Sequence, residues 1–381
     1  MRAAATDGAA PMRAAFVRAL GGPEQIQVGE LPTPRPGPGE VLLAVHASSL
    51  NPVDVLVRSG AFPTETPFPF VLGRDAVGTV VEAGEGAEDL LGQRLATSSL
   101  GHDGRQGAWA EYTVVARERA YPVPGSQTRP EPEAQAWPVP GSQTRPVPED
   151  VAEETLVAAL HPASTAHLAL HRHGGLAPGE TVLIGGGGGN VGGALVAAAV
   201  RCGAHVVATA RERDAARVRA LGADRSTAGA RSGAGTDGAR SGSGTVTTVD
   251  HTDPDAPEQL RALLAGRVDL VVDTSGRLDP ELVADLIAVR GRIVALAAPP
   301  SPPRIPLARL YTRDVSLHGF VISRATVDEL ADAARGTVRL LQETPWRPRI
   351  TETVGLDAAR SLHERLDAGE IRGRVVVRIR A

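Results

Sequence analysis

A glycine-rich stretch from Thr181 to Arg211 constrains the fold of this chain more than any other part of the sequence. A short apolar segment, Thr181–Ile184, runs into five consecutive glycines. An Ala/Val-rich segment with helical composition follows at Gly193–Arg201, and a second apolar segment follows at His205–Thr209. The order strand, glycine turn, helix, strand predicts a βαβ unit that opens on a glycine loop.

The glycine loop has the spacing expected for binding a dinucleotide. Its glycines fall into the pattern G-x-x-G-x-x-G, which lets backbone N–H groups approach a pyrophosphate closely and places negative charge at a helix N-terminus. A flexible low-complexity loop is the alternative, but the flanking strands and helix favour a binding site. The candidate cofactor-binding residues of the loop are Gly186, Gly189, Asn190, Val191 and Gly192.

The end of the second strand indicates which dinucleotide is bound. NAD sites usually carry an acidic residue there, whereas NADP sites carry a basic group for the 2′-phosphate. The first charged residue after the second strand is Arg211, 19 positions after Gly192, which predicts NADPH. Two alternatives stay open: Glu212 faces the ribose instead, or Arg211 is a solvated surface residue.

Length and composition exclude several classes of protein. The 381 residues suggest two domains, and the net charge of −4 with 3% aromatic residues argues against nucleic-acid binding. No apolar run reaches the ~18 to 20 residues of a membrane span, and the first residues lack a signal-peptide core, so we expect a cytoplasmic protein without a membrane segment. The single cysteine, Cys202, excludes an intrachain disulfide and is expected to pack inside its helix.

The pattern of strands and helices changes along the chain. Residues 12–150 contain short strands separated by Gly/Pro turns, which predicts a small β-barrel-type domain. Residues 151–320 alternate strands with helices, which predicts a doubly wound parallel sheet. Residues 321–381 add two helices and a last strand, Val375–Ile379, which we expect to return to the first domain.

Three segments are not expected to contribute to either core. Residues 1–11 read as a disordered extension, because MRAA occurs at Met1 and again at Met12. Residues 121–148 contain the repeat VPGSQTRP and read as a low-complexity insert. Residues 225–246 are rich in Gly, Ser, Ala and Arg and read as a flexible insert.

Six motifs follow one another along the chain: NPVDVLVRSG (Asn51–Gly60), GRDAVGTVVEAG (Gly73–Gly84), AEYTVV (Ala110–Val115), the glycine loop, VVDTSG (Val271–Gly276) and GRVVV (Gly373–Val377). In these motifs and their order the chain resembles the medium-chain dehydrogenases/reductases, and most closely their zinc-independent quinone oxidoreductase (zeta-crystallin-like) branch. The resemblance implies an α/β fold with a GroES-like catalytic domain, a Rossmann domain, and NADPH as hydride donor. It also implies a homodimer formed through an edge strand near Ser316–Phe320.

The positions that hold catalytic zinc in related enzymes correspond here to Asn51, Arg74 and His161. Asparagine is a poor zinc ligand, arginine stays protonated, and one histidine cannot build a site. We therefore expect no metal. Without zinc, a conjugated acceptor is the easier substrate, because charge spreads over an enolate or a quinone system.

The same three residues are the candidate catalytic groups. Asn51 would donate its amide N–H to the substrate oxygen, Arg74 would supply positive charge, and His161 would donate a proton because its unperturbed pKa lies near neutrality. Structural roles compete with each of these: Asn51 as a helix cap, Arg74 paired with Asp75 or Asp54, and His161 as a partly buried helix residue.

The resemblance implies further cofactor contacts. These are Thr165 against the nicotinamide, Arg374 near a cofactor phosphate, and the strand ends and following residues Asp273, Gly276, Ala297 and Phe320. Leu56 and Phe62 stand where many quinone oxidoreductases carry aromatic residues, Leu56 replacing a tyrosine.

The expected reaction is reduction of a small quinone or enone by NADPH. Two alternatives remain: a 2-enal or enoyl-thioester reductase, and an NADPH-binding redox sensor or crystallin-like protein with little catalysis.

Overall fold

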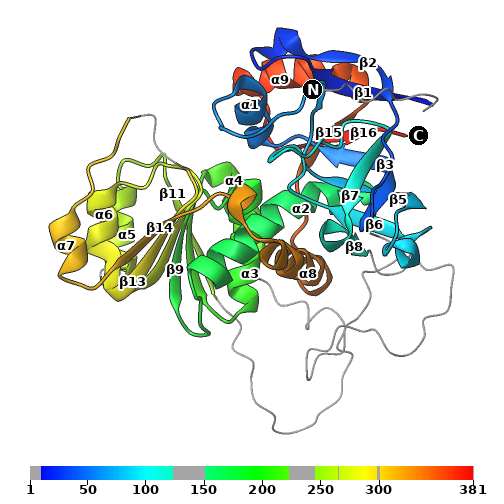
Figure 1. Cartoon of the computed structure of the whole chain (residues 1–381). Helices are drawn as coiled ribbons and strands as arrows, with labels where there is room; N and C mark the ends of the chain where they lie inside the picture. The colour runs from blue at the N-terminus through cyan, green and yellow to red at the C-terminus, as the bar shows by residue number, and fades with distance from the viewer. Residues whose placement is uncertain (1–9, 123–150, 223–244, 265, 298–300, 381) are drawn as a thin grey trace, which may run out of the picture. The chain divides into compact units, whose positions relative to one another are not determined.

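The computed structural model describes residues 10–122, 151–222, 245–264, 266–297 and 301–380, which divide into two compact units (Figure 1). The first unit comprises the chain up to His161 and from Pro348 onward, and the second comprises Pro162–Arg347. These limits lie later in the chain than the predicted domain boundaries after residues 150 and 320. The three segments predicted not to join either core, residues 1–11, 121–148 and 225–246, lie mostly outside the described residues. Pro11, at the end of the first segment, already belongs to a strand.

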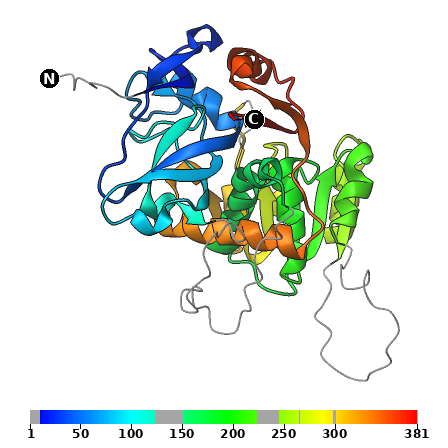
Figure 2. The same ribbon diagram turned by 90° about the vertical axis from the view of Figure 1, so that its right-hand side faces the viewer.

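The first unit is built from antiparallel strands with one parallel pair (Figure 2). A seven-stranded sheet has the order β15-β16-β3-β5-β6-β8 with β7 paired to β3, and a three-stranded sheet has the order β2-β1-β4. The strands are β1 (Pro11–Val17), β2 (Gln27–Pro32), β3 (Glu40–Ser49), β4 (Phe70–Val71), β5 (Ala76–Ala83), β6 (Arg94–Thr97), β7 (Tyr112–Ala116), β8 (Tyr121–Pro122), β15 (Ile350–Val354) and β16 (Arg374–Arg378).

The last strand returns to the first unit, as the sequence predicts. β16 pairs antiparallel with β3, and Val376 lies opposite Ser49. This pairing brings two segments more than three hundred residues apart in sequence into one sheet. As a result, side chains at the end of β3 and the start of β16 share one environment.

Apolar side chains hold this unit together. On β3, Val41, Leu43 and Val45 are buried in one cluster, as the two-residue period of a strand requires. A second cluster joins helix α1 (Pro52–Ser59) to helix α9 (Ala359–Asp367). Proline at the first position of α1 and left-handed Gly60 after it explain where α1 begins and ends.

The second unit contains a six-stranded parallel sheet of order β11-β10-β9-β12-β13-β14. Its strands are β9 (Thr181–Gly185), β10 (His205–Ala210), β11 (Val246–Asp250), β12 (Val268–Asp273), β13 (Ile287–Ala295) and β14 (Ser316–Gly319). The strand order reverses between β9 and β12, which is where ligands bind in open α/β sheets. The predicted doubly wound sheet is confirmed.

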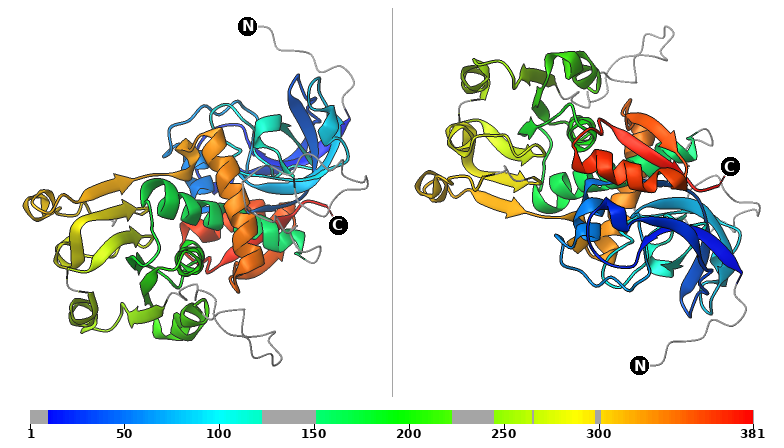
Figure 3. Two further views of the ribbon diagram at one scale, coloured as in Figure 1. Left: turned by 90° about the horizontal axis from the view of Figure 1, so that it is seen from below. Right: turned by 90° about the horizontal axis from the view of Figure 1, so that it is seen from above.

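Helices lie on both faces of this sheet, with α5 and α6 on the face opposite α3 (Figures 1 and 3). The helices from the unit boundary onward are α2 (Glu153–His167), α3 (Asn190–Arg201), α4 (Glu212–Ala220), α5 (Ala256–Leu264), α6 (Pro280–Leu286), α7 (Leu307–Tyr311) and α8 (Val327–Glu343), and α2 continues into a π-helical turn at Leu168–His173. Within the described ranges, no helix is long and apolar enough to cross a membrane.

Two details differ from the sequence expectation. The predicted helix Pro280–Val289 ends at Leu286, because Ile287 is extended and pairs with Val268 in the sheet. Helix α8 belongs to the second unit, where it packs on α3. Gly193 of α3 packs closely on buried Trp346, which follows α8, since a Cβ atom at Gly193 would lie 3.2 Å from the indole nitrogen.

The buried His363 on α9 predicts a loss of stability in acid. Its ring packs edge-on against Trp109 at 5.4 Å, and neither ring nitrogen has a hydrogen-bond partner among the described residues. Burial, with a contribution from Arg58, lowers the pKa of His363 from 6.5 to about 3. The unfolded chain therefore binds the extra proton below pH ~6.5, and stability falls as the pH falls through this window.

We expect His363→Phe to remove this part of the acid sensitivity. The contribution of one such histidine is about 2 kcal/mol between pH ~8 and pH ~5. Urea unfolding at the two pH values should show a smaller stability difference in the variant than in the unsubstituted protein. An unchanged difference would mean that the His363 ring is not buried in its neutral form.

Candidate functional site

The glycines of the loop after β9 let its backbone fold closely on itself. Gly186 has a left-handed φ of 81°, and a Cβ atom on Gly192 would lie 2.1 Å from the carbonyl oxygen of Gly186. Gly189 caps α3, which begins at Asn190 with Val191 in its first turn. A bound diphosphate can therefore approach the backbone and the open N-terminus of α3, so the loop fits a dinucleotide.

The next strand ends place charged residues along the same edge of the sheet. Arg211 is partly exposed and directly follows β10, where it caps α4. Glu212 opens α4, and its backbone N–H donates to Asp250 Oδ2 at 2.9 Å. Sequence reasoning missed Asp250, which ends β11 and is recognisable only once β11 is known to neighbour β10.

Asp273 shapes the loop after β12. Its Oδ1 accepts the backbone N–H groups of Ser275 at 2.8 Å and Gly276 at 3.2 Å, and Gly276 has a left-handed φ of 64°. This carboxylate therefore folds its own turn at the switch point of the sheet.

The remaining cofactor candidates of the second unit lie on different elements. Thr165 is buried in α2, and exposed Ala297 follows β13. Phe320 follows β14 and stacks on the His173 ring with 4.3 Å between ring centroids. Their common function in holding a cofactor stays a prediction.

The first unit contains a buried polar cluster centred on Asn51. The Asn51 amide donates to Asp75 Oδ2 at 2.9 Å and to the Ser49 carbonyl at 3.4 Å. Its Oδ1 accepts from Arg374 Nη1 at 3.0 Å, and Arg374 Nη2 donates to Ser49 Oγ at 2.6 Å. The Asn51 backbone N–H donates to Asp54 Oδ2 at 2.8 Å. All five side chains are buried.

This cluster changes the roles expected for two residues. The Asn51 amide is directed at Asp75 and Ser49 rather than at a substrate, so Asn51 organises the cluster. Arg374, which the resemblance places near a cofactor phosphate, lies buried in the first unit with its guanidinium on Asn51 and Ser49. The cluster combines residues from β3, α1 and β16, which explains why the sequence did not reveal it.

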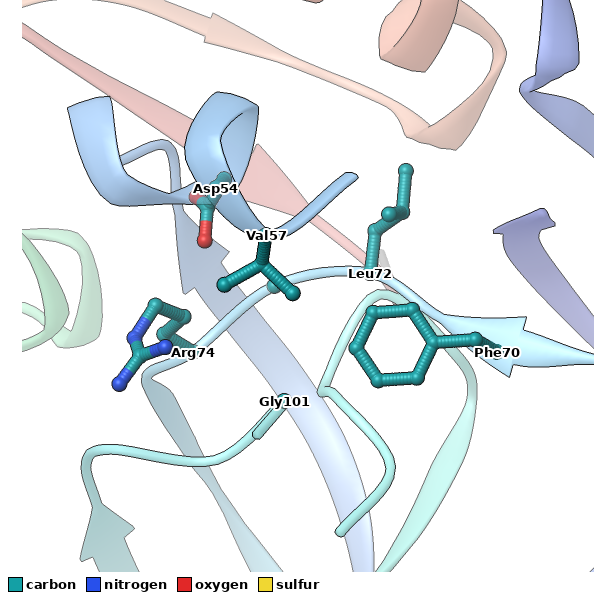
Figure 4. A pocket seen from close by; sticks show the side chains of 7 residues that line it. Asp54, Val57, Phe70, Leu72, Arg74 and Gly101 are labelled. Carbon is teal, nitrogen blue, oxygen red and sulfur yellow. The ribbon is translucent and has the colours of Figure 1, made fainter. Parts of the chain in front are cut away.

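Asp54 and Arg74 line a small pocket within the first unit (Figure 4). The pocket has a volume of about 10 Å³, room for about one water molecule, and its walls also contain Val57, Phe70 and Leu72. Burial raises the pKa of Asp54 to about 7, although the Asn51 N–H and Arg74 oppose that rise. The pocket therefore joins apolar walls to a guanidinium and to a carboxyl group that is partly protonated near neutrality.

His161 does not titrate where the sequence analysis expected. Desolvation, together with Arg374 and Arg74 and against the attraction of Asp75, lowers the pKa of His161 to about 4. The neutral imidazole is then favoured near pH ~7, which argues against proton donation that relies on a near-neutral pKa. The electrostatic partners of His161 place it near the Asn51 cluster.

The residues at the zinc-ligand positions do not fit a zinc ion. Asn51 directs its side chain into the cluster, Arg74 carries a permanent positive charge, and His161 is a single imidazole. Within the part of the chain that the structure describes, no group of three or more His, Cys, Asp or Glu side chains is arranged to hold a metal.

Comparison with known families agrees with this architecture. Residues 37–125 match the alcohol dehydrogenase GroES-like domain family, and residues 190–336 match the zinc-binding dehydrogenase family. The two matches span well over half of the chain. The chain belongs to the medium-chain dehydrogenase/reductase family of oxidoreductases, which has a GroES-like domain and a Rossmann-type parallel sheet.

Individual relatives are distant. Trans-enoyl reductase tndF of Aspergillus flavipes is 31% identical over 56% of this chain, and the match spans 58% of that relative's length. Quinone oxidoreductase of Lama guanicoe is 24% identical over 93% of both chains.

The descriptions of solved structures with the same fold mention different dinucleotides. A structure described as an NAD-dependent alcohol dehydrogenase is 28% identical, with a TM-score of 0.75, and covers 97% of this chain and 100% of its own. A mycobacterial protein complexed with NADPH is 25% identical, with a TM-score of 0.69, and covers 96% of this chain and 99% of its own. The family therefore indicates a pyridine nucleotide without deciding which one.

Replacing Arg374 by Met tests the buried cluster. The substitution leaves Asn51 Oδ1 without its donor and removes one of the two positive charges near Asp75, Arg74 being the other, so we expect the free energy of unfolding to drop by about 3 kcal/mol. Arg378→Met is the matched control on the same strand. Its side chain is 53% exposed and pairs with Glu154, so its loss should change stability by less than about 1 kcal/mol. If Arg374→Met kept normal stability but bound the cofactor more weakly, the structural role of Arg374 in the cluster would be contradicted. The expected contact of Arg374 with a cofactor phosphate would then be favoured.

Proposed function

We propose that this protein is an NADPH-dependent, zinc-independent oxidoreductase that reduces a small quinone or conjugated carbonyl. The observation that carries the proposal is the buried Arg74 guanidinium, which lines an apolar-walled pocket at a position where zinc-dependent relatives hold their ion. A fixed positive charge there can stabilise negative charge that develops on a substrate oxygen.

A conjugated acceptor suits this arrangement. NADPH, when bound, supplies a hydride. Arg74 then stabilises the substrate oxygen on which charge accumulates, and conjugation spreads the rest of that charge. Asn51 and Arg374 hold the surrounding cluster rigid, so little reorganisation accompanies the reaction. Val57, Phe70 and Leu72 give Arg74 apolar surroundings, which screen its charge only weakly.

The cofactor would bind along the second unit's sheet edge. The loop from Gly186 to Gly192 would receive the diphosphate, and Arg211 would pair with the 2′-phosphate. Thr165, Asp273, Gly276, Ala297 and Phe320 remain the proposed contacts of the nicotinamide half.

A second candidate is reduction of a 2-enal or an enoyl thioester. The name of the Aspergillus relative favours it, and the Leu56 and Phe62 positions provide no tyrosine that would point to a quinone. The third candidate, an NADPH-binding redox sensor or crystallin-like protein, requires a bound cofactor without acceptor turnover.

The oligomer proposed with this function is a homodimer formed through β14. β14 is the outermost strand of its sheet, and Leu317 is 50% exposed on it. Unpaired edge strands readily pair with a second copy. A monomer in sedimentation velocity would contradict this assembly.

NADPH consumption with a panel of acceptors distinguishes the candidates. We expect turnover of 1,4-benzoquinone or naphthoquinone and of simple enones, measured by the loss of NADPH absorbance. Turnover of enals or enoyl thioesters with none of quinones selects the second candidate. Tight NADPH binding without any acceptor-dependent oxidation selects the binding protein and rejects the proposed reaction.

Arg211→Asp tests the cofactor assignment. Removing the positive charge and adding a negative one should weaken NADPH binding at least about tenfold and leave NADH binding nearly unchanged. Arg213→Asp, two residues further on and 66% exposed, is the matched control and should change neither affinity much. Equal losses for both dinucleotides would exclude Arg211 as the phosphate contact.

A further inference from the structure

The loop between β6 and β7 has an unusual backbone. Four non-glycine residues in the described chain have a left-handed φ, and two of them, Ser99 at 62° and Asp103 at 50°, lie in this loop. Such conformations are strained for a residue with a side chain and persist where the surrounding structure fixes them, often at functional sites. The loop also reaches the pocket, because Gly101 lines it together with Arg74.

The strained residues belong to one chain of hydrogen bonds that ends on Arg74. Asp103 Oδ2 lies 2.9 Å from His102 Nδ1, and His102 Nε2 lies 3.2 Å from Ser99 Oγ. Arg74 Nη2 donates to Ser99 Oγ at 3.2 Å. The chain thus runs from a half-exposed carboxylate, through a buried imidazole and a buried hydroxyl, to the guanidinium at the pocket.

The chemistry of the groups fixes the direction of the bond between Arg74 and Ser99 and favours one direction for the others. Arginine has no acceptor, so Ser99 accepts from Arg74 and can donate its own proton to His102 Nε2. Arg105 Nη2, also only a donor, lies 3.0 Å from the same nitrogen and 3.3 Å from Nδ1. The shorter contact to Nε2 and the Asp103 carboxylate 2.9 Å from Nδ1 favour the tautomer with its proton on Nδ1, donated to Asp103.

The charged groups around His102 keep it neutral. Desolvation, Arg74 and Arg105 lower the pKa of His102 to about 4, against the opposing effect of Asp103. A neutral His102 ring carries no charge that would repel the Arg74 guanidinium. With its proton on Nδ1, the ring leaves Nε2 to accept from Ser99, which gives the Ser99 hydroxyl a single orientation. Asp103 is itself held by Thr64, which accepts the Asp103 backbone N–H at 2.8 Å.

We propose that Ser99, His102 and Asp103 are positioning residues for Arg74, which hold its guanidinium toward the substrate oxygen in the pocket. This inference rests on the proposed function of Arg74. The order Ser–His–Asp also occurs in hydrolases, but Ser99 is only 3% exposed and its oxygen accepts a bond from Arg74. The geometry therefore favours orientation of Arg74 over nucleophilic attack by Ser99.

Nuclear magnetic resonance tests the hydrogen-bond chain without reference to catalysis. In protein with ¹⁵N-labelled histidine and arginine, we expect His102 to carry its proton on Nδ1 and to stay neutral down to pH ~5. We expect hydrogen exchange of the Arg74 guanidinium to accelerate at least about tenfold in Ser99→Ala, because the protecting acceptor is lost. A proton on Nε2, or unchanged exchange, overturns the inference whatever reaction the protein catalyses.

Steady-state kinetics with the best acceptor from the NADPH-consumption panel test the consequence for catalysis. Ser99→Ala, Ser99→Gly and Asp103→Asn should each lower kcat about 10- to 100-fold with little change in KM, because the bound substrate meets a misplaced guanidinium. NADPH binding should stay the same. Asp89→Asn, a surface carboxylate paired with Arg117 in the same unit, is the control for loss of one negative charge and should retain normal kcat.

The two Ser99 variants separate positioning from folding. Glycine adopts the left-handed φ without strain, so Ser99→Gly should unfold at a temperature no lower than Ser99→Ala does. If both variants lose kcat despite this difference in stability, the hydroxyl matters for orientation. Normal kcat in stable Ser99→Gly would overturn the inference. Absence of turnover in the unsubstituted protein would reject only the proposed function. The exchange measurement would still show whether the hydrogen bonds from Asp103 to Arg74 hold the guanidinium.

Discussion

Burial of opposite charges around Asn51 is the constraint on which the candidate site depends. Asp54, Asp75, Arg74 and Arg374 are all almost inaccessible to solvent, so each must find its partners within the protein. The bonds of Asn51 to Asp75 and Arg374 meet part of this need and tie β16 to the end of β3. The return of the C-terminal strand is therefore needed for the site as well as for the sheet.

The same cluster explains how a member of this family can keep a charged site without the zinc-ligand residues. Where related enzymes carry ligands, this chain carries an amide, a guanidinium and a neutral imidazole. The guanidinium offers a positive charge that needs no metal, and the partly protonated Asp54 balances it only in part. The apolar walls of the pocket strengthen that field, since low-polarity surroundings screen it weakly.

The sequence predicted the elements that depend on local patterns. The glycine loop and the parallel sheet follow from spacing and from residue type, and both are present. The return of the last strand was expected because it follows a helix outside the alternation of strands and helices, and β16 pairs with β3. The end of α6 at Leu286 was missed, because pairing of Ile287 with Val268 overrides local helix preference.

The candidate site was less predictable because its contacts join distant segments. Arg374 lies 323 residues from Asn51 along the chain, and no local pattern reveals their hydrogen bond. The pKa of His161 depends on desolvation by the folded protein, which composition does not encode. The chain from Asp103 to Arg74 likewise depends on left-handed backbone at two non-glycine residues, for which sequence alone gives little signal.

The rate of NADPH oxidation after metal removal tests the central claim most directly. The protein is dialysed against a strong chelator, its metal content is measured by mass spectrometry, and the rate is recorded with a quinone and with an enone. The account predicts the same rate before and after dialysis, with no gain on adding zinc. Loss of the rate on chelation and its recovery with zinc would contradict it.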